Sequence, residues 1–421
     1  MKLTVLCPHF APDPAPTGEV ITRIVHELAD RGHEVHVVTA LPWYTHHRIE
    51  DGWGGRLVRR EVTPWGSITR VHPFPSDKTS LALRSASFGA FSALSGVAAL
   101  RGGRMDAVLA MSPPLPIGLV AWAAAVFHRC PLVFNVQDVF PDVAVDLGKL
   151  TDPRLVRAAR WLERTTYARA DAVTVLSEDL RDNIAAKVRR EHRDDVRVIP
   201  NFVDTEAIRP LPRGTAYRRE LGIGDDQTVV LYAGNVGFSQ SLDLLVEAAR
   251  RLAHRPELVF VVNGGGSGLA DVRKSAENLP NVRFAPYQPR ERLPEVLASG
   301  DLHVVLLRAG LAAASVPSKT YSILAAGRPL LASIDPGTEV TRVVTASGCG
   351  VSVPPDDPDA FTAAVESLVS DGDGMAAMGR RGRAWVERWV SAAAVAEAYE
   401  DLFDEVRQGN RWGRQPPRRA R

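Results

Sequence analysis

Residues 315–329 read Ser315-Val316-Pro317-Ser318-Lys319-Thr320-Tyr321-Ser322-Ile323-Leu324-Ala325-Ala326-Gly327-Arg328-Pro329. The stretch follows a strand-like run, residues 301–307, and predicts a helix that ends at Gly327. Pro317 suits the first helical turn, because the amide hydrogen that proline lacks would have no partner there. The free amides of that turn, together with Lys319, predict a phosphate site, and a nucleotide diphosphate is the ligand we expect. Taken alone, the segment is better explained as an ordinary strand–loop–helix corner with a solvated lysine, so the interpretation depends on the rest of the chain.

Short β-branched runs alternate with helical patterns along the chain, which is typical of parallel sheets wound by helices. In the first half we expect strands at residues 3–6, 34–39, 107–111, 132–136, 172–176 and 196–199, with a hairpin across 57–71. The pattern restarts with expected strands at 228–232, 258–263, 282–284, 302–307, 330–333 and 350–353. The chain therefore predicts an α/β fold of two doubly wound, Rossmann-like domains.

Composition limits the class of protein. The 421 residues are 45% hydrophobic, enough for two cores, and 51 Lys and Arg against 49 Asp and Glu give a formal charge of +2. That balance argues against a nucleic-acid partner. Cys7, Cys130 and Cys349 are far apart and lack metal-ligand spacing, which indicates reduced core thiols and a cytoplasmic protein. The N-terminal apolar run is too short for a signal peptide, and prolines interrupt residues 107–127, so we expect no membrane-spanning helix.

Ligands of such sheets bind beyond the carboxyl ends of the strands, so the loops there hold the candidate sites. Gly18, at the start of the helix after the first strand, would let a phosphate or sugar approach the backbone; a proline-stiffened loop explains it as well. After strand 228–232, Gly234, Asn235 and Gln240 precede a helix and suit phosphate.

A glycine run, residues 264–268, follows strand 258–263. It matches neither common spacing of phosphate-binding glycines, so by itself it is weak evidence. We interpret Gly265 as part of the cleft wall, where the backbone approaches the nucleotide, and a plain turn is nearly as good an explanation.

Asp138 follows an otherwise apolar strand, residues 132–136. A carboxylate is costly to bury without a partner, so we expect Asp138 to face the cleft. Asp142, four residues later, would simply cap a loop. The Asp-rich runs at 356–359 and 371–373 lie at helix starts or in turns, and we interpret them as caps rather than as a metal site.

Six short motifs occur in order along roughly residues 1–405. They are Gly32-His-Glu-Val, Gln137-Asp-Val-Phe-Pro141, Val198-Ile-Pro-Asn201-Phe-Val-Asp204, Ala233-Gly-Asn235, Val316-Pro-Ser-Lys319-Thr-Tyr and Leu324-Ala-Ala-Gly327-Arg-Pro329. Together they resemble the family-4 glycosyltransferases, most of all the branch that builds bacterial capsule, O-antigen or colanic-acid-type polysaccharides and includes N-acetyl-fucosamine transferases. The ordered set carries the resemblance, since no single motif is specific.

The resemblance implies a GT-B fold, with two Rossmann-like domains facing a central cleft and a C-terminal helix that returns to the first domain. It implies an acceptor-binding domain at 1–202, a nucleotide-sugar-binding domain at 203–385 and returning helices at 386–408. Residues 409–421 are expected to form a disordered basic tail. It also implies transfer with retention of the anomeric configuration, without a bound metal or other cofactor.

The chain departs from the family where the donor is held. Asn235 and Gln240 stand in place of an Arg and a Lys, and Ala314 and Ser322 stand in place of two Glu. We therefore assign Lys319 the catalytic task of neutralising the leaving diphosphate.

Other groups would assist Lys319. We expect Arg308 and backbone amides to contribute, and Tyr287 and Gln288 to lie where the family binds its base, uracil by default; a half-buried loop aromatic explains Tyr287 slightly better in isolation. The donor-binding candidates are Gly18, Gly234, Asn235, Gln240, Gly265, Tyr287, Gln288, Arg308, Ser315, Val316, Pro317, Ser318 and Ser322.

The chemistry asks little of side chains, because positioning and anion stabilisation supply most of the acceleration. In the family the departing phosphate oxygen is thought to take the acceptor proton. Asp138 is the second catalytic candidate, to orient the acceptor or stabilise charge on the sugar ring.

Residues 78–104 predict a helix rich in Leu and Phe with Lys and Arg near its ends. Together with aromatic and basic residues at 43–65, it would contact the anionic inner leaflet of the plasma membrane. An ordinary helix that packs its apolar stripe on the sheet is the competing interpretation.

The function we expect is transfer of a hexosamine or deoxyhexose from a nucleotide sugar, UDP-linked by default, to a polyprenyl-diphosphate-linked glycan in cell-surface polysaccharide synthesis. The alternatives are a nucleotide-sugar 2-epimerase, a transferase with a soluble small-molecule acceptor, and a non-catalytic sugar-binding protein. A proline-rich first loop argues against an NAD-linked oxidoreductase.

Overall fold

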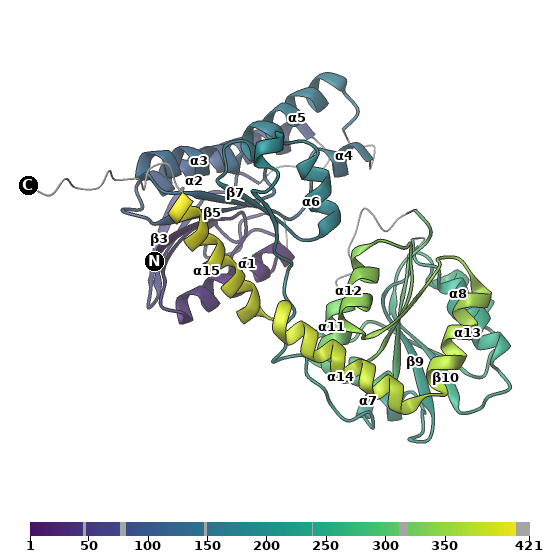
Figure 1. Ribbon diagram of the computed structural model, residues 1–421. Helices are drawn as coiled ribbons and strands as arrows, with labels where there is room; N and C mark the ends of the chain where they lie inside the picture. The colour runs from purple at the N-terminus through teal and green to yellow at the C-terminus, as the bar shows by residue number, and fades with distance from the viewer. Residues whose placement is uncertain (45–47, 76–80, 147–149, 238, 311–318, 410–421) are drawn as a thin grey trace, which may run out of the picture. The chain divides into compact units, whose positions relative to one another are not determined.

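The computed structural model describes residues 1–44, 48–75, 81–146, 150–237, 239–310 and 319–409. The chain forms two compact units, one of Met1–Asn201 with the chain from Val395 onward and one of Phe202–Ala394 (Figure 1). We had expected the returning helices to begin at residue 386. Residues 386–394 belong instead to the second unit, because helix α14 (Gly372–Trp389) continues past this point and Val390 and Ser391 pair with Val203.

The first unit contains an eight-stranded sheet in the order β3-β4-β2-β1-β5-β6-β7-β8. Neighbouring strands are parallel, except that β3 and β4 form the expected antiparallel hairpin. The strands are β1 (Lys2–Leu6), β2 (Glu34–Ala40), β3 (Val58–Thr63), β4 (Gly66–Val71), β5 (Ala107–Ser112), β6 (Leu132–Val136), β7 (Ala172–Val175) and β8 (Val196–Val198). The helices are α1 (Pro16–Asp30), α2 (Leu81–Leu100), α3 (Ile117–His128), α4 (Asp142–Asp146), α5 (Pro153–Tyr167) and α6 (Glu178–Ala185), with a 3-10 turn, η1 (Arg190–His192).

The second unit contains a six-stranded parallel sheet in the order β11-β10-β9-β12-β13-β14. The strands are β9 (Thr228–Asn235), β10 (Leu258–Gly265), β11 (Val282–Ala285), β12 (Leu302–Leu306), β13 (Leu330–Ser333) and β14 (Gly350–Val353). The helices are α7 (Ala216–Glu220), α8 (Leu242–Arg251), α9 (Leu269–Ser275), α10 (Leu293–Ser299), α11 (Lys319–Ala325), α12 (Glu339–Ser347), α13 (Pro358–Val369) and α14, with a 3-10 turn, η2 (Arg290–Arg292). Every strand expected from the sequence is present, and the prediction of two doubly wound α/β halves is confirmed.

Helices cover both faces of the second sheet. In β9, Val230 and Tyr232 belong to the core that includes α8 and α13, whereas Val229 and Leu231 belong to the core on the side of α7 and α10. A strand buried on both faces needs apolar residues at nearly every position, which explains the nearly continuous apolar runs in the sequence.

Helix α15 (Ala392–Gly409), yellow in Figure 1, packs on the first unit. The amide of Asn135 in β6 donates to the Tyr399 hydroxyl at 3.0 Å, and Arg197 in β8 donates to Glu405 at 2.6 Å. Glu400 also lies 3.0 Å from Nε2 of His33. These contacts hold the C-terminal helix against the first sheet.

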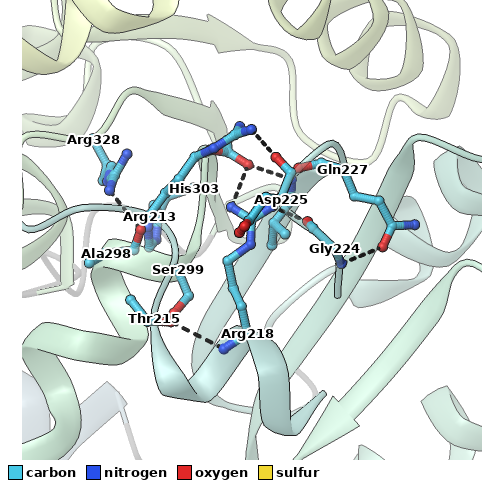
Figure 2. Close-up of polar contacts among 12 residues, drawn as sticks. Arg213, Thr215, Arg218, Gly224, Asp225, Gln227, Ala298, Ser299, His303 and Arg328 are labelled. Carbon is cyan, nitrogen blue, oxygen red and sulfur yellow. Dashed lines mark hydrogen bonds and ion pairs between the residues drawn. The ribbon is translucent and has the colours of Figure 1, made fainter. Parts of the chain in front are cut away.

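A buried ion pair lies at the amino end of the second sheet, within the polar network of Figure 2. Asp301, just before β12, accepts from Arg218 at 3.1 Å and from Arg213 at 3.2 Å. It also accepts from the backbone amide of Val229 in β9, at 2.8 Å. Arg218 is 1% exposed, so Asp301 ties α7 and the segment before it to two central strands.

Candidate active site

Two glycine-containing strand ends lie side by side at the carboxyl edge of the second sheet. Gly234 and Asn235 of β9 pair with Gly264 and Gly265 of β10. Gly234 and Gly264 have φ of +144° and +150°, and a Cβ on Gly264 would lie 1.9 Å from the Gly234 carbonyl oxygen. Only glycine allows this approach, so the backbone itself forms the edge where ligands of such sheets bind.

Lys319, in α11, lies against this edge. Its Nζ is 3.9 Å from the centre of the Tyr232 ring, and a Cβ on Gly234 would lie 3.5 Å from the same nitrogen. In the described part of the chain no carboxylate pairs with Lys319, and burial lowers the pKa of its ammonium to about 7. A cation held by an aromatic ring and glycine, without a counter-charge, is suited to bind an anion.

The other polar candidates of this loop shape the loop itself. The Gln240 carbonyl oxygen accepts from the amide of Gly237 at 3.0 Å, and its amide nitrogen donates to the Ser239 hydroxyl at 2.8 Å. Asn235 is exposed, and a Cβ on Gly237 would lie 2.9 Å from its amide nitrogen. Asn235 therefore presents a polar amide at the surface of the edge, whereas both ends of Gln240 are used inside the loop.

Arg308 is paired with carboxylates. Its guanidinium donates to Asp243 at 3.1 Å and lies 3.5 Å from Asp356. Asp356 also accepts from the amide of Ala309 at 3.0 Å. Partial burial opposes ionisation of its carboxyl, but the hydrogen bonds from Ala309 and Ser241 and the charge of Arg308 together lower its pKa. Arg308 thus joins the end of β12 to the start of α8, and the carboxylates of Asp243 and Asp356 offset its positive charge.

Tyr287 packs on the glycine edge from the β11 side. Its hydroxyl donates to the Gly265 carbonyl at 3.3 Å, and the residue is 58% exposed, which leaves ring surface available for stacking. Gln288 donates to the Pro286 carbonyl and accepts from Arg292, each at 3.1 Å. Ser322 is half-buried on α11, while Ser315, Val316, Pro317 and Ser318 lie outside the described residues.

In the first unit Gly18 is buried at the start of α1, where a Cβ would lie 2.9 Å from the Cβ of His9. The loop after β1 therefore packs directly on the helix, and this packing requires a glycine. The sequence interpretation placed a phosphate or sugar close to the backbone of Gly18. In the structure the loop itself occupies that space.

The sequence alone did not indicate the histidine–aspartate pair that this loop contains. Nδ1 of His9 lies 2.6 Å from Asp13, which is 3% exposed and also accepts from the amide of Tyr44 at 3.0 Å. The imidazole stacks on Trp43 with ring centres 5.6 Å apart. The available signal was a histidine and an aspartate four residues apart after the first strand, in a sheet whose winding reverses between β1 and β5.

Asp138 lies just beyond the carboxyl end of β6 and is exposed. No side chain in the described ranges pairs with it, and desolvation by surrounding protein raises the pKa of its carboxyl. Asp142 is not a cap. It pairs with Lys187 at 2.6 Å and with Asn183 at 3.2 Å, because α6 passes alongside.

The segment expected to contact a membrane forms α2, which packs on the core of the first unit. Phe91 and Ala99 are buried there and Leu94 packs against them, whereas Val97 is 44% exposed. Residues 78–80 lie outside the described part of the chain. Part of the apolar stripe of α2 is therefore used in packing, as the competing interpretation expects, and Val97 and Leu100 remain exposed.

Two of the aromatic residues near that segment are also engaged. The guanidinium groups of Arg59 and Arg70 lie 4.4 and 4.9 Å from the Trp53 ring centre. Trp65 packs against Phe10.

The remaining acidic and thiol candidates have structural roles. Asp357 and Asp371 accept from amides at the starts of α13 and α14, which confirms them as caps. The three cysteines are free and buried, and burial raises the pKa of the Cys7 and Cys130 thiols to about 12. No helix in the described ranges is both long and apolar enough to span a bilayer. The expected tail, 410–421, lies outside those ranges.

Comparisons with known proteins identify the family. The family model described as Glycosyl transferase 4-like domain matches residues 17–201, and the model described as Glycosyl transferases group 1 matches residues 214–385. A D-inositol 3-phosphate glycosyltransferase of Kineococcus radiotolerans is 32% identical over 305 residues, 67% of this chain and 68% of the relative. The chain belongs to the family-4 glycosyltransferases.

Other relatives of this glycosyltransferase extend the comparison. A putative colanic acid biosynthesis glycosyl transferase of Escherichia coli strain K12, WcaI, is 29% identical over 380 residues, 88% of this chain and 92% of the relative. The crystal structure of Anabaena HepE in complex with UDP has a TM-score of 0.67 at 15% identity, covering 96% of this chain and all of that one. The GT-B fold of two Rossmann-like halves is thereby established, and the glycine edge with Lys319 lies in the half that matches the group 1 model.

Proposed function

We propose that this glycosyltransferase moves a hexosamine or deoxyhexose from a UDP-linked donor, with retention of configuration, to a polyprenyl-diphosphate-linked glycan in cell-surface polysaccharide synthesis. The enzyme would work in the cytoplasm, at the inner face of the plasma membrane. The name of WcaI supports the polysaccharide role, and the UDP complex of HepE supports a uridine nucleotide.

The observation that carries the proposal is the unpaired ammonium of Lys319 against Tyr232 and Gly234. A diphosphate at the glycine edge supplies the counter-charge that no described carboxylate supplies. The phosphate oxygens then accept hydrogen bonds from strand-end amides, and the exposed ring of Tyr287 offers a stacking surface for the base.

The reaction breaks the bond between the anomeric carbon and the diphosphate oxygen, and the electron pair stays on that oxygen. Lys319 stabilises the new negative charge, which is the main electrostatic demand of the step. The acceptor oxygen forms the new bond to the anomeric carbon, and its proton passes to the departing phosphate oxygen. The residues that bind the acceptor therefore need only to position its hydroxyl group.

On the acceptor side we assign His9 and Asp138. Asp13 holds one ring nitrogen of His9, so the other nitrogen has a defined direction and is suited to accept a hydrogen bond from a sugar hydroxyl. Asp138 has an exposed carboxyl without a described partner and is suited to a second hydroxyl.

A soluble acceptor is the second candidate. The relatives named D-inositol 3-phosphate glycosyltransferase favour it, including one from Nocardia farcinica that is 28% identical across the whole chain. The donor chemistry would be unchanged.

Two measurements test the proposal. A thermal-shift screen with UDP-, GDP- and dTDP-sugars should give the largest stabilisation with a UDP-sugar, because a ligand of the folded state raises the melting temperature. Product analysis by NMR, with a lipid-linked glycan or a polyol phosphate as acceptor, should then show an unchanged anomeric configuration in the lipid-linked product. Inversion would contradict a retaining mechanism, and transfer only to the polyol phosphate would contradict a lipid-linked acceptor. Interconversion of the donor sugar without an acceptor would instead indicate an epimerase.

A further inference from the structure

Two amide side chains are buried at the carboxyl end of β6, where the core pattern of the strand favours apolar residues. Asn135 is 1% exposed and Gln137 is 7% exposed, although their neighbours along the strand are apolar. A buried amide costs free energy unless its hydrogen bonds are made, and apolar residues of similar shape would pack at least as well. Stability alone therefore does not explain these two residues.

The amide of Gln137 uses both of its hydrogens. Its Nε2 donates to Oδ1 of Asn135 at 2.7 Å and to Oδ1 of Asn201 at 3.3 Å. Its Oε1 accepts from Nδ2 of Asn201 at 2.9 Å. Two amides that exchange hydrogen bonds in both directions fix each other's orientation, because turning either one over would bring like atoms together.

The amide network continues to the C-terminal helix. Nδ2 of Asn135 donates to Oγ1 of Thr174 in β7 at 3.1 Å and to the Tyr399 hydroxyl of α15 at 3.0 Å. Asn201, at the other end, is the residue at which the first segment of this unit ends. The network thus joins α15, two strands and the end of that segment, and it brings together two sequence motifs whose contacting residues are 64 positions apart.

Asp138 follows Gln137 directly and is exposed, but both of its neighbours are anchored. Gln137 is held by the amide network, and Val139 is 3% exposed in the core of the first unit. The Asp138 carbonyl also accepts from the amide of Phe140 at 3.1 Å, which closes a tight turn. A short side chain between two anchored residues has few directions available, so the network decides where the carboxylate of Asp138 lies.

We propose that Gln137 and Asn201 are positioning residues of this transferase, which direct the carboxylate of Asp138 toward the acceptor. The inference rests on the acceptor role of Asp138 in the proposed function and adds the two amides through which that role is fulfilled. Gln137 and Asn201 act through Asp138 and need no contact with the acceptor.

Acceptor kinetics of Asn201→Ala and Gln137→Ala test the inference. The acceptor is the one that supports transfer in the product analysis, either the lipid-linked glycan or the polyol phosphate. Both variants should lose roughly tenfold or more in kcat/KM for the acceptor, because a carboxylate displaced by about 1 Å positions a hydroxyl poorly. The calorimetric affinity for a UDP-sugar should stay as in wild type, since the glycine edge belongs to the second unit.

A double-mutant cycle with Asp138→Ala separates positioning from a general structural role. If Asn201 acts through Asp138, the loss caused by Asn201→Ala should shrink to less than about twofold in the Asp138→Ala background. General loosening of the fold would instead multiply the two losses. The matched control is Asn281→Ala, which removes a buried amide that donates to the Ala249 carbonyl at 2.8 Å. It should lower the melting temperature and leave acceptor kinetics unchanged.

A second measurement needs no acceptor. Desolvation by surrounding protein raises the pKa of the Asp138 carboxyl. Carbon-13 NMR of protein labelled at the aspartate carboxyls follows that titration, with the resonance identified by its loss in Asp138→Ala. In Asn201→Ala the pKa should move toward its ordinary value as the carboxylate turns into water, whereas Asn281→Ala should leave it unchanged.

Three results would overturn the positioning role and leave the proposed function intact. They are wild-type acceptor kinetics in Asn201→Ala, losses that multiply in the cycle, and an Asp138 titration that Asn201→Ala does not alter. Weaker donor binding in Asn201→Ala would also contradict an effect confined to the acceptor. Wild-type acceptor kinetics in Asp138→Ala would contradict the acceptor role of Asp138 in the proposed function, and the positioning role with it.

Discussion

The Nζ of Lys319 lies 3.9 Å from the centre of the Tyr232 ring, although the two residues are 87 positions apart in the chain. Tyr232 belongs to β9 and Lys319 to α11, the helix between β12 and β13, so the contact joins two separate strand–helix units of the same sheet. It holds a cation over the glycine edge, which gives the catalytic proposal a defined place.

Replacing Lys319 with Ala should lower kcat/KM by roughly 100-fold or more, because stabilisation of the leaving diphosphate is lost. Initial rates with a UDP-sugar measure the change. Lys274→Ala, at an exposed lysine of α9, is the matched control and should behave as wild type. Normal turnover in Lys319→Ala would remove Lys319 from the mechanism.

Affinity for a UDP-sugar should fall as pH rises. Burial lowers the pKa of Lys319 to about 7 in the free enzyme, and the bound diphosphate favours the charged form, so the dissociation constant should increase by up to about tenfold per pH unit above 7. Calorimetry between pH 6 and pH 9 measures the slope, and Lys319→Arg, which stays charged, should flatten it. The same slope in both proteins would contradict the assignment.

The folded state should show the same titration without ligand. A lysine with a lowered folded pKa binds fewer protons than the unfolded chain between about pH 7 and pH 10.5, so its contribution to stability rises with pH in that window. Below pH 7 the buried ammonium is charged, and the destabilisation of the folded state that its burial causes is fully present. Comparing the melting temperatures of wild type and Lys319→Met across this range isolates the effect, and parallel curves would contradict it.

Gly264→Ala should destabilise the second unit by at least about 2 kcal/mol, because a Cβ there would lie 1.9 Å from the Gly234 oxygen at a φ of +150°. Gly268→Ala, where the nearest atom would be 3.4 Å away, is the control and should be nearly neutral. Urea denaturation measures both. Equal stability of the two variants would mean that the strand ends do not approach as described.

His9→Ala should raise KM for the acceptor while the calorimetric affinity for the donor stays the same, because His9 lies in the first unit and the glycine edge in the second. Asp13→Asn should reproduce part of the effect by releasing the imidazole from its carboxylate. If donor affinity falls with either substitution, His9 does not act on the acceptor.

Nearly continuous apolar runs predicted the two mainly parallel sheets, since a strand covered on both faces must be apolar at nearly every position, and the ordered motifs indicated the family. Lys319 was predicted as the cation of the donor site from its place at a strand–loop–helix corner together with the motifs in the rest of the chain. These signals are local, because strand burial and helix starts depend mainly on residues that are adjacent in the sequence.

Pairing of side chains was decided only by the tertiary structure. Arg308 was expected to assist at the diphosphate, but the fold brings Asp243 and Asp356 to it. The apolar stripe of α2 was also open to two interpretations from the sequence, and only the fold shows that Phe91 and Ala99 are buried in the first core whereas Val97 and Leu100 are exposed. The physical reason is that ion pairs and buried faces depend on which segments, distant along the chain, are packed together, and neither composition nor periodicity records that choice.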